Sequence, residues 1–310
     1  MKVVVLGSGA MGSLYGGTLA EAGCEVVFVD VWKDHVEAIN ERGLTIEKPE
    51  GEKTIRGMRA VLKASDAGNA DLVIVFVKAT ATEEAMRGAL SLVGERTTVL
   101  TLQNGLGNVE KLCCFVQSSN VIAGTTGHGA MLLGPGKIRH AGVGDTVIGE
   151  LDGSRSERIE AIAALLEQAG MASKISTNVL GLIWTKLIVN VGINALTAVT
   201  GLKNGRLVDF LETETLMKAA IEEACSVAER KGIILEVDEP FEYTRNVAKK
   251  TAENRSSMLQ DILAKRPTEI TVINGAIVDE GKRLGIPTPV NSLLTDMVLV
   301  RQQTYEEAFQ

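Results

Sequence analysis

Three strongly polar residues recur at every fourth position in an otherwise apolar stretch between Gly181 and Gly201. They are Lys186, Asn190 and Asn194. Residues four apart lie on one face of an α-helix, so an ammonium and two amides would project together from a helix whose other faces are apolar. Because an unpartnered polar group is costly to bury, we expect this face to line a ligand cleft or to meet a partner.

The same stretch has two explanations that involve no chemistry. About twenty apolar residues can span a bilayer, but a lysine and two asparagines near the middle of a span would be costly, and the chain offers no second span or basic flank. We therefore do not expect a membrane protein. The other explanation is a buried helix whose lysine has a structural partner, and the stretch alone does not decide between that lysine and a catalytic one.

Composition narrows the class of protein. The chain has 310 residues, of which 45% are hydrophobic and 23% charged, so it is long enough for two globular domains. Its net charge of −7 gives no electrostatic reason to expect nucleic acid as a partner. The four cysteines and three histidines lack the spacing of a zinc site or a disulfide scaffold, so no metal is predicted. The apolar run that precedes Gly7 is too short for a signal peptide, so a cytoplasmic location is expected.

A glycine-rich motif follows the first predicted strand, residues 3–6, and opens a helix; its residues are Gly7, Ser8, Gly9, Ala10, Met11 and Gly12. Without a ligand it would be a tight turn, but G-x-G-x-x-G between a strand and a helix places a dinucleotide pyrophosphate on backbone N–H groups. The second strand, residues 26–29, ends at Asp30. A carboxylate there binds an adenosine ribose and repels a 2′-phosphate, so Asp30 favours NADH, although nearby Lys33 would soften this preference.

The alternation of strands and helices continues beyond this unit. Further strands are predicted at residues 72–77 and 98–102, with a helix beginning near Thr82. After Asn120, short runs separated by glycines predict partly antiparallel strands at residues 121–123, 130–133, 137–140 and 146–150. Ser154 or Ser156 is expected to cap a helix that ends at Gly170.

From about residue 180 onward the patterns are helical only. Helices are predicted over residues 213–231, 239–253, 257–263, 268–284 and 292–303. The fold class is therefore α/β, an N-terminal doubly wound Rossmann-type sheet followed by an all-helical C-terminal domain. We assign residues 1–176 to a dinucleotide-binding domain and residues 177–310 to a helical substrate-binding domain.

Other polar residues occupy positions where ligands bind in such folds. Lys78 and Asn104 follow strands, at the sheet edge that binds the cofactor. Ser256 or Ser257 is a natural helix N-cap with unpaired N–H groups beyond it. Glu269 alone would be read as an acid favoured by a helix dipole.

Together these segments resemble the ketopantoate reductase (2-dehydropantoate 2-reductase) family over essentially the whole chain. The segments within residues 256–261 and 268–275 are the specific ones, because they lie in the helical domain and are not general features of dinucleotide folds. The full set is residues 7–12, Lys78, 103–105, 125–128, 184–187 with Asn190 and Asn194, 204–205, 256–261, 268–270 and 273–275.

The resemblance implies reduction of 2-dehydropantoate (ketopantoate) to (R)-pantoate by a nicotinamide cofactor, on the route to pantothenate and coenzyme A. It implies that Lys186 donates the proton, since a cation with transferable protons stabilises the negative charge that hydride addition places on a ketone oxygen. The implied substrate-binding residues are Asn190, Asn194, Asn204, Asn254, Ser256 and Ser257. The implied cofactor contacts are Gly7 to Gly12, Lys78, Asn104, Ala130 and Glu269.

One residue departs from the family pattern. Many members carry a basic residue at the end of the second strand for the 2′-phosphate of NADPH, whereas this chain has Asp30. NADP(H), which the resemblance implies, and NAD(H), which Asp30 favours, therefore both stay open.

Several other functions stay open as well. An NADH-dependent reductase of another branched or aromatic 2-keto acid, that is, a D-2-hydroxyacid dehydrogenase, is one alternative. A 3-hydroxyacid dehydrogenase and a non-catalytic NAD(H)-sensing protein are the others. The expected partner is a small 2-keto acid, without nucleic acid or membrane, and a homodimer is a candidate assembly.

Replacing Asp30 by Arg should shift cofactor preference toward NADPH, because a guanidinium would attract the 2′-phosphate that the carboxylate repels. We expect the ratio of kcat/KM for NADPH to kcat/KM for NADH to rise roughly tenfold, equivalent to about 1.4 kcal/mol. Steady-state kinetics with both cofactors measure this ratio, and an unchanged ratio would show that Asp30 does not read the ribose.

Overall fold

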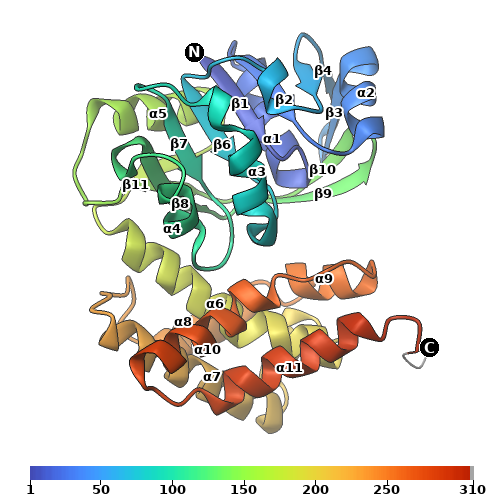
Figure 1. The fold of residues 1–310 in the computed structure, drawn as a ribbon. Helices are drawn as coiled ribbons and strands as arrows, with labels where there is room; N and C mark the ends of the chain where they lie inside the picture. Colours follow the sequence, from blue (N-terminus) through green and yellow to red (C-terminus); the bar gives the residue numbers. More distant parts are fainter. Residues whose placement is uncertain (308–310) are drawn as a thin grey trace. The chain divides into compact units, whose positions relative to one another are not determined.

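The computed structural model describes residues 1–307, which divide into two compact units. The first contains residues 1–103 and 108–179, and the second contains residues 104–107 and 180 onward. The second unit thus includes a four-residue segment from the middle of the first. Figure 1 shows the elements of both units.

An eight-stranded sheet forms the centre of the first unit, with its strands in the order β12-β11-β8-β7-β6-β1-β2-β5. The strands from β8 to β5 pair in parallel, and β11 runs antiparallel to β8, as the glycine-separated runs predicted. The bounds are β1 (Lys2–Leu6), β2 (Glu25–Val29), β5 (Arg59–Val61), β6 (Leu72–Val75), β7 (Thr98–Thr101), β8 (Val121–Thr126), β11 (Thr146–Glu150) and β12 (Ser173–Ile175).

Alternate side chains of these strands pack into two apolar clusters, one on each face of the sheet. Val3 and Val5 of β1 belong to the cluster that includes side chains of α1 (Ala10–Glu21), α2 (Lys33–Arg42) and α5 (Glu157–Gln168). Val4 and Leu6 belong to the other, with side chains of α3 (Thr82–Gly88) and α4 (Asn108–Cys113). The continuous apolar runs of the sequence therefore reflect burial on both faces.

A second, four-stranded sheet lies beside α1, in the order β4-β3-β10-β9. Its strands are β3 (Leu44–Lys48), β4 (Gly51–Ile55), β9 (Gly129–Gly134) and β10 (Lys137–Gly142). The sequence predicted two of these strands, but not that they leave the main sheet. It made no assignment between Val31 and Asp71, where α2, β3, β4 and β5 form.

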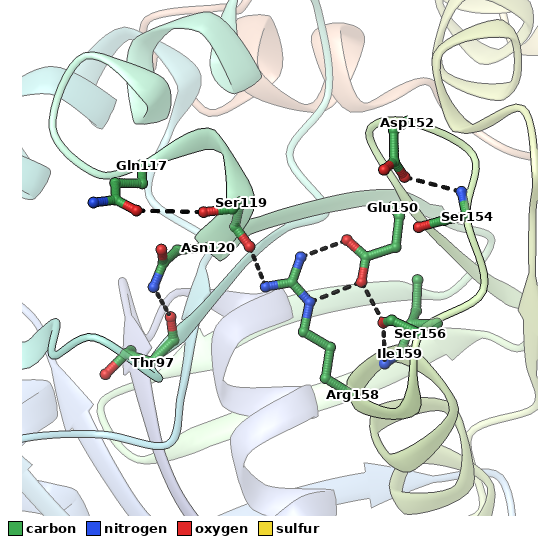
Figure 2. A network of polar contacts seen from close by, with 10 residues as sticks. All are labelled: Thr97, Gln117, Ser119, Asn120, Glu150, Asp152, Ser154, Ser156, Arg158 and Ile159. Atoms are coloured by element: carbon green, nitrogen blue, oxygen red, sulfur yellow. Dashed lines mark hydrogen bonds and ion pairs between the residues drawn. The ribbon is translucent and has the colours of Figure 1, made fainter.

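The helix after β11 begins where a serine caps it. Ser156 Oγ accepts the N–H of Ile159 at 3.2 Å and donates to the Glu150 carboxylate at 2.5 Å. Arg158 binds the same carboxylate and the carbonyl of Ser119 (Figure 2). Of the two serines predicted as the N-cap, Ser156 is therefore the one used, and the network fixes α5 to the end of β11.

The second unit is helical apart from its turns. Its helices are α6 (Val179–Thr200), α7 (Leu211–Arg230), α8 (Pro240–Lys250), α9 (Ser257–Leu263), α10 (Asn274–Leu284) and α11 (Pro289–Gln303), which pack around one apolar cluster. Within residues 1–307, α6 is the one helix long and apolar enough to cross a membrane, but 67% of its most apolar window is buried inside the protein. Its apolar faces thus supply the core of the unit.

One predicted helix is interrupted. The helix expected over residues 268–284 is a 3₁₀ turn, Ile270–Val272, followed by α10 from Asn274. The carbonyl of Val272 accepts the N–H of Leu106 at 2.9 Å, so it points to a distant segment of the chain. That carbonyl is engaged outside the helix, and α10 begins two residues later, at Asn274.

Several element ends also differ from the prediction by a few residues. The strands expected to reach residues 77 and 102 end at Val75 and Thr101, and the helix expected to reach residue 253 ends at Lys250. The last helix begins at Pro289, three residues before its predicted start, because proline suits the first turn of a helix.

Candidate active site

The glycine loop of the first unit is held in one conformation by its neighbours. Gly7 has a φ of 94°, and a Cβ there would lie 2.6 Å from the backbone nitrogen of Val77. A Cβ on Gly12 would lie 1.9 Å from the carbonyl oxygen of Gly7. Around Gly9, in contrast, a Cβ would meet nothing within 4 Å. The loop is thus packed on its inner side and open at Gly9, where α1 begins.

Hydrogen bonds commit the first two N–H groups of the loop to β2. Gly7 donates to the carbonyl of Val29 at 2.8 Å, and Ser8 donates to Oδ2 of Asp30 at 2.6 Å. The Asp30 carboxylate also accepts the Ser8 hydroxyl at 3.0 Å and the N–H of Trp32 at 2.9 Å. Gly9 is the first loop residue exposed to solvent. The open start of α1 is the arrangement that binds a pyrophosphate.

A cavity of about 550 Å³ opens beside this loop. It is lined by the carboxyl ends of β1 and β2, by the segment after β5, and by one face of α3. Asp30 and Glu84 contribute carboxylates to it, Lys63 an ammonium, and Val31, Leu62 and Ala85 apolar surface. The volume, the apolar walls and the adjacent helix N-terminus suit the adenosine half of a dinucleotide.

Phe76 and Val77 separate Lys78 from the end of β6, and Lys78 is exposed. Gln103, at the end of β7, fixes this turn, because its Nε2 donates to the carbonyl of Val77 at 2.7 Å and to Thr82 Oγ1 at 2.8 Å. Gln103 therefore shapes the backbone from which Lys78 extends. The next residue, Asn104, belongs to the helical unit.

Ala130 lies on β9, paired with His140 of β10. Nδ1 of His128 is 3.1 Å from Nε2 of His140. Burial lowers the pKa of both imidazoles, and the charge of His140 lowers that of His128 further. Both imidazoles near Ala130 therefore favour their neutral form.

In the helical unit, Lys186 lies on α6 in the line that the sequence predicted, with Asn190 and Asn194. Burial lowers the pKa of Lys186 to about 8, and the negative charge of Glu269 partly offsets this effect. Glu269 is itself buried, immediately before the 3₁₀ turn Ile270–Val272. An ammonium with this pKa is about nine-tenths protonated at pH 7 and releases its proton more readily than an exposed lysine.

A hydroxyl pair connects this line to the start of α9. Thr197 Oγ1 donates to the carbonyl of Asn194 at 2.9 Å and pairs with Ser256 Oγ at 2.6 Å. Ser256 also caps α9 by accepting the N–H of Leu259 at 3.0 Å, whereas Ser257 is exposed. Thr197 thus links the backbone of α6 at Asn194 to Ser256, and the Ser256 hydroxyl is committed to structural bonds.

Asn204 and Asn254 form a second group. The N–H of Asn204 donates to the carbonyl of Asn254 at 3.0 Å, and its Nδ2 donates to Thr251 Oγ1 at 3.0 Å. The side-chain oxygen of Asn204 is buried and has no hydrogen-bond partner among the described residues. A buried amide oxygen without a partner is rare in folded proteins, so Asn204 is a candidate functional position.

Two contributors were not among the predicted site residues. Thr197 lies three residues after Asn194, so the helical spacing that revealed the polar line also contained it. Asn274 donates to the carbonyl of Val191 at 3.3 Å and to Asn291 Oδ1 at 3.0 Å, which fixes α10 to the middle of α6. Asn274 lies in the segment 273–275 that carries the family resemblance, but the sequence does not indicate its bond to Val191.

Two family models together match most of this chain. The model described as ketopantoate reductase PanE/ApbA matches residues 3–153, and the model of its C-terminal domain matches residues 178–302. The chain belongs to the ketopantoate reductase family. Two curated relatives are the 2-dehydropantoate 2-reductases of Halobacterium salinarum and Pyrococcus horikoshii. The first is 38% identical over 98% of this chain and 99% of its own, and the second is 35% identical over 97% and 98%.

Solved structures agree on the fold. A D-mandelate dehydrogenase with NADH and anilino(oxo)acetate has a TM-score of 0.93 at 31% identity, and 99% of each chain is covered. A PanE/ApbA family ketopantoate reductase from Ralstonia eutropha JMP134 has a TM-score of 0.91 at 34% identity, covering 99% of this chain and 100% of its own. The predicted fold class and family resemblance are thus confirmed, and the chain is a ketopantoate reductase family oxidoreductase.

Replacing Glu269 by Gln should shift the alkaline limb of ketone reduction toward lower pH. The carboxylate raises the pKa of Lys186, so its loss leaves the ammonium deprotonated at a lower pH. With Lys186 as the proton donor, as the family resemblance implies, the rate would be retained below this pKa and lost above it. The pH profile of kcat at saturating substrates measures the limb.

A suitable control is Glu222→Gln, since Glu222 is an exposed acid of α7 paired with Lys218. That variant should leave the limb unmoved. A limb at the same pH in Glu269→Gln and in the unmodified protein would contradict the electrostatic pairing of Glu269 with Lys186.

Proposed function

We propose that this protein reduces 2-dehydropantoate to (R)-pantoate with a nicotinamide cofactor, and that Lys186 supplies the proton. The observation that carries the proposal is the lysine of lowered pKa on α6, aligned with two asparagines, in a chain whose curated relatives are 2-dehydropantoate 2-reductases. A product on the route to pantothenate and coenzyme A agrees with a cytoplasmic enzyme.

Each polar group then has a chemical role. The bound reduced nicotinamide supplies the hydride for the substrate carbonyl carbon. The Lys186 ammonium donates a hydrogen bond to the ketone oxygen and transfers its proton as negative charge develops there. The charge of Glu269 raises the pKa of that ammonium and so favours its protonated form. Asn190, Asn194 and Asn204 bind the polar groups of the substrate.

The exposure of their side chains distinguishes the other residues proposed to contact the substrate. Ser257 is accessible, and Asn254 presents an exposed side chain. Ser256 acts mainly through the backbone that it caps, since its hydroxyl already bonds to Thr197 and Leu259. We therefore assign direct contacts to Asn254 and Ser257, and to Ser256 the placement of the α9 start.

For the cofactor we propose NAD(H). The cavity beside the glycine loop contains two carboxylates, Asp30 and Glu84, and one ammonium, Lys63, so its net charge opposes a 2′-phosphate. The solved D-mandelate dehydrogenase structure contains NADH. Gly9 to Gly12 would hold the pyrophosphate, and Lys78, Asn104 and Ala130 would complete the cofactor contacts. Because Asp30 also anchors Ser8, Asp30→Arg should weaken binding of both cofactors, and the ratio between them is the informative quantity.

A second candidate substrate is an aromatic 2-keto acid. The D-mandelate dehydrogenase resembles this chain as closely in fold as the ketopantoate reductase does, and NADH is its bound cofactor. The chemistry assigned to Lys186 is the same for both substrates. Only the side chain of the keto acid distinguishes the two activities.

Initial rates with ketopantoate, 2-ketoisovalerate and benzoylformate, each with NADH and with NADPH, test the proposal. We expect the highest kcat/KM for ketopantoate with NADH. Preference for benzoylformate would establish the second candidate, and the absence of turnover with all three acids would contradict both.

Replacing Lys186 by Ala should lower kcat by about 10²- to 10⁴-fold, the usual contribution of a positioned proton donor. Its effect on the dissociation constant for NADH should be small, because the donor acts mainly in the transition state. Stopped-flow turnover and fluorescence titration with NADH measure the two quantities. Turnover near that of the unmodified protein would remove Lys186 from its assigned role.

A further inference from the structure

Four groups of the first unit form a buried chain of hydrogen bonds that ends on the glycine loop. Gly136 N–H lies 3.0 Å from Nδ1 of His35, and Nε2 of His35 lies 3.1 Å from Ser13 Oγ. Ser13 Oγ in turn lies 2.6 Å from the carbonyl oxygen of Ser8. His35, Ser13 and Ser8 are all fully buried.

The direction of every proton in this chain is determined by its two ends. A backbone N–H only donates, so Nδ1 of His35 accepts from Gly136 and Nε2 carries the ring hydrogen. A carbonyl only accepts, so the Ser13 hydroxyl donates to Ser8 and receives the hydrogen of Nε2. This arrangement requires a neutral imidazole, and burial lowers the pKa of His35 even though the charge of Asp30 raises it.

The bond to Ser8 also fixes the next N–H. The carbonyl of Ser8 and the N–H of Gly9 belong to one peptide group, and the chain has no cis peptide bond among its described residues. In a trans peptide these two groups point in opposite directions. With the carbonyl turned inward to Ser13, the N–H of Gly9 points outward, at the exposed start of α1.

We infer that Ser13 and His35 are positioning residues for the cofactor: they lock the Ser8–Gly9 peptide so that Gly9 N–H faces the pyrophosphate. This inference rests on the proposed dinucleotide binding. Glycine tolerates peptide orientations that other residues avoid, so Gly9 alone would not hold this one. On its other side, Ser8 is held by Asp30 through its N–H, so both backbone polar groups of Ser8 are fixed.

The far end of the chain is fixed as well. Gly136, in the turn between β9 and β10, has a φ of 72°, and its carbonyl accepts the N–H of Thr45 at 2.8 Å. A Cβ there would lie 3.0 Å from Cβ of Ala38 on α2, so the close approach to α2 depends on glycine. His35 also stacks on Trp32, with the ring centroids 5.2 Å apart and an interplanar angle of 7°. Gly136, in a turn of the second sheet, thus holds the His35 ring within hydrogen-bond distance of Ser13.

The test is the dissociation constant for NADH, measured by fluorescence titration, together with kcat at saturating NADH. We expect Ser13→Ala to raise the dissociation constant about tenfold, the effect of a misdirected hydrogen-bond donor to a charged group. Its kcat should stay within about twofold, because the reacting atoms are untouched. The matched control is Thr18→Ala, which removes a hydroxyl that donates to the carbonyl of Leu14 on the same helix. That control should leave both quantities unchanged.

Two variants of His35 provide a test that does not depend on Ser13→Ala folding. Gln places an amide N–H near the position of Nε2, so His35→Gln should keep the bond to Ser13 and most of the affinity. Asn places its amide near Nδ1, so His35→Asn should keep only the bond to Gly136 and bind NADH as weakly as Ser13→Ala.

The outcomes separate this inference from the function on which it rests. Equal NADH affinity in Ser13→Ala and the unmodified protein would overturn it, as would equal losses in Ser13→Ala and Thr18→Ala or tighter binding by His35→Asn than by His35→Gln. An unmodified protein that binds neither NADH nor NADPH would overturn the proposed function and this inference together.

Discussion

A lysine ammonium placed on an apolar helix is the constraint around which the helical unit is organised. Removing Lys186 from water favours its neutral form, and the nearby charge of Glu269 acts in the opposite direction. α6, which carries Lys186, and the segment that carries Glu269 must therefore keep their positions for Lys186 to remain protonated. The bond from Asn274 to Val191 and the interrupted helix around Ile273 serve this requirement, because they fix the segment after Glu269 against α6.

The glycine loop obeys a similar rule with backbone groups in place of a charge. A turn this tight buries N–H and carbonyl groups that cannot reach water, so each needs a partner. Val29 and Asp30 receive the N–H groups of Gly7 and Ser8, and Ser13 serves the Ser8 carbonyl. What remains accessible is the start of α1. The binding surface is thus defined by which backbone groups are already occupied.

The sequence predicted those parts of the fold whose signals are local. The α9 bounds follow from a serine cap, and β1, β2 and α6 follow from apolar spacing. The break at Ile273 was missed because its cause, the N–H of Leu106, lies far away in sequence. The strand β4 escaped notice because Ile55 is its single buried residue. Side-chain roles divide in the same way: Lys186 was visible from spacing, whereas the bond between His35 and Gly136 joins residues that no periodicity connects.

The segment Asn104–Gly107 belongs to the helical unit but is synthesised before the helices of that unit. These residues leave the ribosome directly after β7, yet the carbonyl that receives the N–H of Leu106 is that of Val272, which is made much later. The link between β7 and α4 must therefore wait, without its final partner, while six helices, α4 to α9, are translated. Because the partner of Leu106 lies just before α10, the helical unit can be completed only late in synthesis. Until then, the nascent protein holds the segment Asn104–Gly107 without its bond to Val272.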